Sequence, residues 1–148
     1  MPKTIYKLIV QSPKKMRYLT IGDYYKIKNG WDVITADLGK SDYNFLILIH
    51  ELIELYLTQK RGITEPKIKK FDEWFENEKI KGRFKNIIEA GFHPKAPYRK
   101  EHIFATKIEK ILAKELKVNW KKYYEAMDRV WEVIQKILET RPQKYTKN

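Results

Sequence analysis

His50, Glu51 and Glu54 are polar side chains in a segment, from Phe45 to Leu57, that is otherwise apolar apart from one tyrosine. A helix with apolar residues on every side is normally buried. Burying a carboxylate without a partner costs several kcal/mol, so something must compensate Glu51 and Glu54. A bound metal ion is the leading candidate for this partner.

The spacing of these three residues is that of two metal ligands beside a base. Residues four apart lie about 40° from each other around a helix, so His50 and Glu54 point to one place, and Glu51 flanks them within about 100°. In zinc hydrolases with a His-Glu-x-x-His helix, the two histidines bind the metal and the intervening Glu is the general base. The chain resembles that motif over five residues, with Glu54 in place of the second histidine. Zinc is the predicted metal, and the carboxylate also admits manganese, iron or magnesium.

A third ligand has to come from another part of the chain, which contains no cysteine. The two remaining histidines are His93 and His102. In the predicted helix 98–116, His102, Ala105 and Glu109 fall on one inward stripe, where the small alanine leaves space. We therefore predict His102 as the third ligand, with Glu109 either orienting it or binding the metal directly.

Residues around the start of the same helix are further candidates. Tyr98 and His93 could contact a substrate or stabilise a charged intermediate, which makes Tyr98 a candidate catalytic residue. Glu101, next to His102, is an additional candidate ligand. In the competing interpretation, a buried pair such as His102 with Glu54 is only a hydrogen bond that fixes helix packing.

The predicted fold is a single α+β domain in which a small N-terminal antiparallel sheet packs on about four helices. Residues 1–40 have strand-like patterns, and Asn29-Gly30 between two of them is a strong hairpin signal. Residues 78–97 are predicted to be a long loop of the kind that carries function, and residues 142–148 a disordered tail. Periodicity and capping residues predict helices over 42–61, 64–77, 98–116 and 119–140.

Composition limits the classes of protein and partner. The chain has 148 residues, and no stretch approaches the about 20 apolar residues that span a bilayer, so we expect a soluble cytoplasmic protein with no membrane partner. A formal net charge of +12 favours anionic partners such as nucleic acid. The lysines are scattered, however, without an arginine-rich arm or a nucleic-acid motif, which favours a solvated basic surface.

A second resemblance is carried by His50 to Gly62, by Phe71-Asp72 with Phe75-Glu76, and by Ala96 to Thr106. In these stretches the chain resembles a group of small phage and bacterial proteins that have no established activity. The likeness covers roughly Tyr43 to Tyr124 and implies a shared fold. A small sheet followed by the motif-bearing helix is the arrangement of minimal metallopeptidases, so this resemblance implies a zincin-like layout.

We therefore expect a metal-dependent hydrolase, with a peptide as one candidate substrate, and two alternatives stay open. All-α nucleoside-triphosphate pyrophosphatases chelate magnesium with Glu-x-x-Glu followed by Glu-x-x-Asp. The pairs Glu51 with Glu54 and Glu125 with Asp128 match these letters, although the gap between them is too long and the N-terminal sheet does not belong to that family. The second alternative is a non-catalytic basic accessory protein of a phage or its host that binds nucleic acid or another protein.

Overall fold

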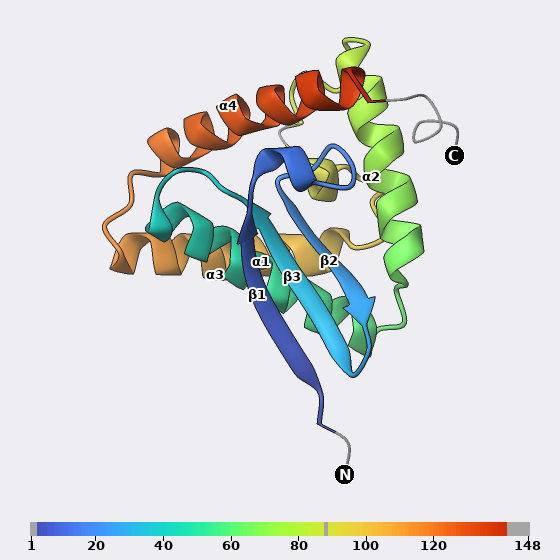
Figure 1. The fold of residues 1–148 in the computed structure, drawn as a ribbon, viewed down its shortest axis with the longest axis vertical. Helices are drawn as coiled ribbons and strands as arrows, with labels where there is room; N and C mark the ends of the chain where they lie inside the picture. The colour runs from blue at the N-terminus through green and yellow to red at the C-terminus, as the bar shows by residue number, and fades with distance from the viewer. Residues whose placement is uncertain (1–2, 88, 142–148) are drawn as a thin grey trace.

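The computed structural model describes residues 3–87 and 89–141 and shows an α+β fold, as the sequence predicts (Figure 1). A three-stranded sheet is formed by the N-terminal part of the chain, and long helices follow it. The strands are β1 (Ile5–Gln11), β2 (Gly22–Ile27) and β3 (Gly30–Ala36). The helices are α1 (Ser41–Lys60), α2 (Glu65–Ile80), α3 (Arg99–Glu115) and α4 (Trp120–Glu139), with short 3-10 turns at η1 (Pro13–Lys15) and η2 (Ala90–Phe92). The predicted tail, 142–148, lies outside the described residues.

The sheet is mixed, with β3 in the centre. β2 and β3 form the predicted antiparallel hairpin, and Asn29 takes a φ of 66° in the turn. β1 pairs with the other edge of β3 in the parallel direction, with Ile5 opposite Gly30. A Cβ on Gly30 would lie 1.8 Å from the carbonyl oxygen of Ile5, so this close approach requires glycine. The sheet is thus antiparallel only in the hairpin, because a short turn fixes the direction of the strands it joins and not that of β1.

Helix α1 packs against one face of the sheet (Figure 1). Two of its motif residues, His50 and Glu54, are buried. Its Leu55 shares a core cluster with Tyr24 and Val33 of the sheet. Helix α3 packs along another side of α1. The prediction that α1 is buried all round is wrong, since Phe45 and Tyr56 are 43% and 56% exposed. The sheet and α3 cover only part of the circumference of this helix.

Helices α2 and α4 complete the structure on the side away from the N-terminus (Figure 1). In α4, Tyr123 and Met127 pack with Leu46 of α1, and Ile134 packs with Ile34 of β3. The apolar stripe of α4 is therefore core packing, as its spacing predicts.

Local signals place most element boundaries correctly. Asn119 caps α4 by accepting a hydrogen bond of 3.0 Å from the backbone N–H of Lys122, as predicted. Helix α2 continues to Ile80 instead of ending at residue 77, and α1 starts after Lys40 without a side-chain cap. Within the described residues, none of the helices has the length and apolar character needed to cross a membrane.

Candidate metal centre

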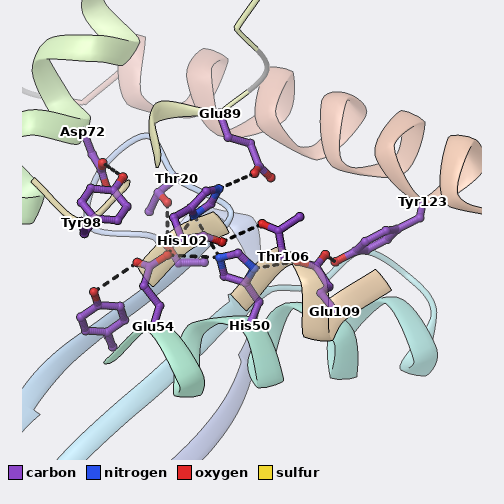
Figure 2. Close-up of polar contacts among 12 residues, drawn as sticks. Thr20, His50, Glu54, Asp72, Glu89, Tyr98, His102, Thr106, Glu109 and Tyr123 are labelled. Carbon is purple, nitrogen blue, oxygen red and sulfur yellow. Dashed lines mark hydrogen bonds and ion pairs between the residues drawn. The ribbon is translucent and has the colours of Figure 1, made fainter. Parts of the chain in front are cut away.

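The three predicted ligands come from two helices that lie side by side. His50 and Glu54 are one turn apart on α1, and His102 is near the start of α3 (Figure 2). All three are buried, with exposed fractions of 5%, 4% and 7%. Gly91 of η2 lies against the His102 ring, and a Cβ at Gly91 would be 2.2 Å from the ring Cγ. The packing of the loop on α3 at this point therefore needs a residue without a side chain.

The ligand side chains converge on a small triangle of atoms. Nε2 of His50 is 3.1 Å from Nδ1 of His102 and 3.1 Å from Oε2 of Glu54, and the third edge, from His102 to Glu54, is 2.9 Å. These residues form a buried group that could hold a metal ion. The ligands of a tetrahedral ion with bonds of about 2.0–2.1 Å lie about 3.3–3.4 Å apart, so the triangle fits one ion after shifts of a few tenths of an ångström.

Each imidazole of this triangle is held from behind by a carboxylate. Nδ1 of His50 donates to Oε1 of Glu109 at 2.6 Å, and Nε2 of His102 donates to Oε2 of Glu89 at 2.8 Å (Figure 2). Glu109 also accepts a hydrogen bond of 2.6 Å from the hydroxyl of Tyr123. A carboxylate behind a ligating histidine fixes its tautomer and orients its ring, which is the common arrangement at protein metal sites.

Glu109 orients a different histidine from the one predicted. Its position on the α3 stripe suggested that it orients His102 or binds the metal. Glu109 follows His102 by seven residues, which is about two turns, or roughly 10 Å, along α3. It therefore does not orient His102 and instead accepts a hydrogen bond from His50 on α1. His102 is oriented by Glu89, which comes from the segment between α2 and α3.

The three inner atoms of the triangle are all hydrogen-bond acceptors. Because the outer nitrogen of each ring donates its proton to a carboxylate, the inner nitrogen of a neutral imidazole presents a lone pair. Oε2 of Glu54 presents another lone pair to the same place. Acceptors that meet at 2.9–3.1 Å in a buried site need a cation between them, either a metal ion or added protons.

The pKa values of these groups show how strongly the site favours positive charge. Burial by itself lowers the pKa of His102, but the hydrogen bonds to Glu54 and Glu89 outweigh it and raise the pKa to about 9. Burial opposes charge on His50 in the same way, and Glu109 and Glu54 raise its pKa well above the ordinary value. Burial by itself raises the pKa of Glu54, but hydrogen bonds from the two histidines lower it to about 2. In the absence of a metal ion, both imidazoles therefore carry a second proton and a positive charge at neutral pH.

Glu51 lies beside the triangle rather than in it. It is half-buried, and its carboxyl covers Gly22 of β2, where a Cβ would be 2.2 Å from Oε1. Among the described residues, none donates a hydrogen bond to this carboxyl. Burial and the charge of Glu54 raise the pKa of Glu51 well above its usual range. A carboxyl with a raised pKa takes up a proton more readily than an ordinary carboxylate.

The triangle and Glu51 line a cavity of about 330 Å³. Its walls come from all four long helices, from β2 and from the segment before β2. The volume is at the lower end of the range for small-ligand sites, which is about 300–1,000 Å³. The site is therefore buried in the protein but borders a space large enough for a small ligand.

Three residues that support the ligands were not predicted from the sequence. Glu89 holds His102, Tyr123 donates to Glu109, and the hydroxyl of Tyr24 donates to Oε1 of Glu54 at 3.2 Å. Alternation along β2 could have placed Tyr24 on the inward face of the strand. The predicted α4 stripe contains the neighbouring Tyr124, which is half-buried, whereas Tyr123 is fully buried.

Two other candidates lie away from the triangle. His93 does not line the cavity; its Nδ1 accepts a hydrogen bond of 3.0 Å from the backbone N–H of Lys95. Glu101 is buried but forms an ion pair with Arg61. The ring of His93 is surrounded by those of Phe71, Trp74, Phe75 and Phe84.

Tyr98, the candidate catalytic tyrosine, lines the cavity but points to a different carboxylate. Its hydroxyl donates to Oδ1 of Asp72 (Figure 2). The hydroxyl of Tyr18 donates to Oδ2 of the same carboxylate at 3.3 Å. The Tyr98 ring centroid is 6.0 Å from that of His102. The structure thus brings Tyr98 near the ligands, with its hydroxyl engaged by Asp72.

The carboxylate pattern of the pyrophosphatase alternative is not assembled. Glu125 and Asp128 are both exposed on α4; Asp128 reaches the cavity wall and Glu125 does not. Within the described residues, the group that could hold a metal ion consists of His50, Glu54 and His102. The structure therefore favours a His and Glu site over a cluster of four carboxylates.

Comparisons of the chain with models of protein families, with curated proteins and with solved structures found no significant match. The resemblance to small phage and bacterial proteins therefore stays a prediction. The case for a function depends on the geometry of the site.

Proposed function

We propose that this chain is a metal-dependent hydrolase of peptidase-like layout whose ion is held by His50, Glu54 and His102. The observation that carries the proposal is the convergence of three acceptor atoms from side chains whose imidazoles are already bonded to Glu109 and Glu89 (Figure 2). Burying this many carboxylates is costly unless cations compensate them. A metal ion supplies that compensation and also accounts for the orientation of both rings.

Zinc is the metal we propose. Two imidazoles and one carboxylate are the ligand set of thermolysin-type and carboxypeptidase-type zinc sites, which keep an open position for water or substrate. In the His-Glu-x-x-His motif both helix ligands are histidines, whereas here the helix supplies His50 and Glu54 and the second imidazole comes from His102 on α3. When bound, the ion supplies a Lewis acid and lowers the pKa of water.

Glu51 is the proposed general base. It follows His50 on α1 and lines the same cavity. Its raised pKa lets it take a proton from water in the cavity and pass that proton to the leaving group. A structural metal site is usually closed by four protein ligands and needs neither an adjoining cavity nor an unbonded carboxyl. These two features support catalysis over a purely structural role.

A peptide is the proposed class of substrate. β2 lies at the edge of the sheet, and its Gly22 and Tyr24 line the cavity beside Glu51 and Glu54. The outer carbonyls of Gly22 and Tyr24 already accept hydrogen bonds from Thr20 Oγ1, at 2.6 Å, and from Arg17, at 3.3 Å. The support for a peptide is therefore the likeness of a small sheet followed by the motif helix to the layout of minimal metallopeptidases. The layout therefore supports hydrolysis of a peptide or a related amide.

The test combines metal content with turnover. Purified protein is analysed for metals, stripped with a chelator, reloaded with zinc, manganese or iron(II), and incubated with a peptide library that is read by mass spectrometry. We expect about one ion per chain and cleavage that is lost on chelation and restored by the metal. Protein that takes up no ion would contradict the whole proposal, and a stoichiometric ion without cleavage would contradict the hydrolase.

One substitution separates the base from the ligands. Glu51→Gln should keep the ion and lower turnover by about 10²–10⁴-fold, because the amide cannot accept a proton. Glu125→Gln makes the same change of charge on the exposed face of α4 and should leave both quantities unchanged. Full activity of Glu51→Gln would remove Glu51 from the proposed chemistry.

A further inference from the structure

The residues that line the cavity are mainly acidic, although the chain as a whole is basic. Among the described residues that line it, ten are acidic and three are Lys or Arg. In the full sequence, 31 Lys and Arg stand against 19 Asp and Glu. More than half of the acidic residues of a strongly basic chain therefore line this one space, which a random distribution of charges would not produce.

The cations of the wall do not neutralise it. Arg17 is shared by Asp23, at 2.6 Å, and Glu65, both of which also line the cavity. Lys69 pairs at 2.7 Å with Glu73, which does not line the cavity. The third cation is Lys79, whose Nζ lies 5.9 Å from the ring centroid of Phe75. Its charge lowers the pKa of Glu76 but does not overcome the opposite effect of burial.

The proposed metal ion does not neutralise the wall either. A divalent ion offsets at most two charges, and three carboxylates already surround the ligand triangle, namely Glu54, Glu89 and Glu109. Further acidic residues line the cavity, and among the described residues none of them forms an ion pair with Lys or Arg. These are Glu51, Asp72, Glu76, Asp128 and Glu132.

Glu76 and Trp131 form the part of this wall that is best built to receive a cation. Glu76 is 9% exposed, and its Oε2 accepts a hydrogen bond of 3.1 Å from the indole N–H of Trp131. Both side chains line the cavity, one from α2 and the other from α4. Burial raises the pKa of Glu76 to about 7, and a cation in the cavity would form an ion pair with this carboxyl and favour its charged form.

We infer that the cavity selects ligands that carry an ammonium or guanidinium group, with Glu76 and Trp131 as recognition residues. If the proposed function holds, the substrate is then a peptide with a free amino terminus, or with a Lys or Arg side chain, near the bond that is cleaved. Coulomb interactions are strong in a partly desolvated cavity, so a phosphate group is disfavoured there. Nucleotides and nucleic acid are therefore restricted to the basic outer surface.

Calorimetric titration of zinc-loaded protein with four tripeptide amides tests this inference. The first is acetylated Ala-norleucine-Ala amide, which is neutral. The second replaces norleucine by Lys, the third keeps norleucine but has a free amino terminus, and the fourth replaces norleucine by Glu. We expect at least one of the two cationic peptides to bind about tenfold or more tightly than the neutral one, and the Glu peptide to bind most weakly. Which cationic peptide binds more tightly separates a side-chain cation from an amino terminus.

Two variants and one control test which residues cause the preference for cationic over neutral peptides. Glu76→Gln should reduce it to less than about threefold, and Glu132→Gln, at an exposed position on the cavity wall, should reduce it more weakly. Glu125→Gln should leave it unchanged. Equal or tighter binding of the neutral or Glu peptide by wild-type protein would overturn the inference, and an unchanged preference in Glu76→Gln would remove Glu76 from it. These titrations do not need turnover, so an inactive protein that prefers cationic peptides would contradict only the proposed function.

Discussion

The three histidines of this chain are almost equally buried but have two opposite environments. His50 and His102 are 5% and 7% exposed and are surrounded by carboxylates, which raise their pKa values. His93 is 7% exposed and lies among aromatic rings, where burial, followed by the charges of Lys95 and Arg83, lowers its pKa. Burial of a histidine therefore says little about metal binding. The groups that contact both ring nitrogens decide whether the ring can serve as a ligand.

Removing one histidine from each environment should give the largest contrast. His50→Ala and His102→Ala should reduce the metal content from about one ion per chain to none, because each removes one of three protein ligands. His93→Ala should keep the ion and lower the free energy of unfolding by about 2–4 kcal/mol through the space it leaves among the rings. Elemental analysis and urea denaturation measure the two effects. A folded His93→Ala protein without metal would contradict the distinction between the two environments.

The carboxylates behind the ligands should give an intermediate effect. Glu109→Gln and Glu89→Gln should each weaken metal binding by about 10–100-fold, because the amide orients its histidine less firmly and lowers its basicity. Glu115→Gln, at an exposed position on α3, provides the matched control. Competition with a chelator of known affinity measures the change. Unchanged affinity in both variants would mean that Glu109 and Glu89 serve packing alone.

The pH dependence of metal binding should give the smallest of these effects per pH unit. It tests whether His50 and His102, unlike His93, have raised pKa values. The folded protein without an ion holds protons on His50 and His102 at pH 7, since both pKa values are raised, that of His102 to about 9. The ion must displace those protons, so affinity should rise with pH, by up to about tenfold per unit for each proton released, and less steeply above about pH 9, where His102 has already lost its proton. Zinc titrations between about pH 6.5 and 9, in buffers of different ionisation enthalpy, measure both the affinity and the protons released. An affinity that falls with pH over this range would contradict the proposed ligand set.

Local sequence signals were sufficient for most of the fold. Asn29-Gly30 predicted the hairpin, and periodicity with caps such as Asn119 predicted the long helices to within a few residues at their ends. The direction of β1 was not predictable in the same way, because β1 reaches β3 only after the intervening β2 has been placed. Neither was the exposure of Phe45 and Tyr56, which depends on how much of α1 its neighbours cover.

The candidate ligands were also predictable, but their partners were not. Four-residue spacing placed His50 with Glu54, and the inward stripe of α3 selected His102. The pairing of Glu109 with His50 and of Glu89 with His102 depends on how α1, α3 and the segment before α3 pack together, which no spacing within one helix encodes. The aromatic surroundings of His93 likewise depend on packing between α2 and the segment that joins it to α3, so no local pattern predicted them.

The central claim is that one ion is held jointly by atoms from α1 and α3, and anomalous diffraction from crystals grown with zinc tests it most directly. The account predicts a single strong peak about 2.0–2.2 Å from His50 Nε2, Glu54 Oε2 and His102 Nδ1. A peak at another position, or no peak at saturating zinc with the two imidazoles turned away from each other, would contradict it.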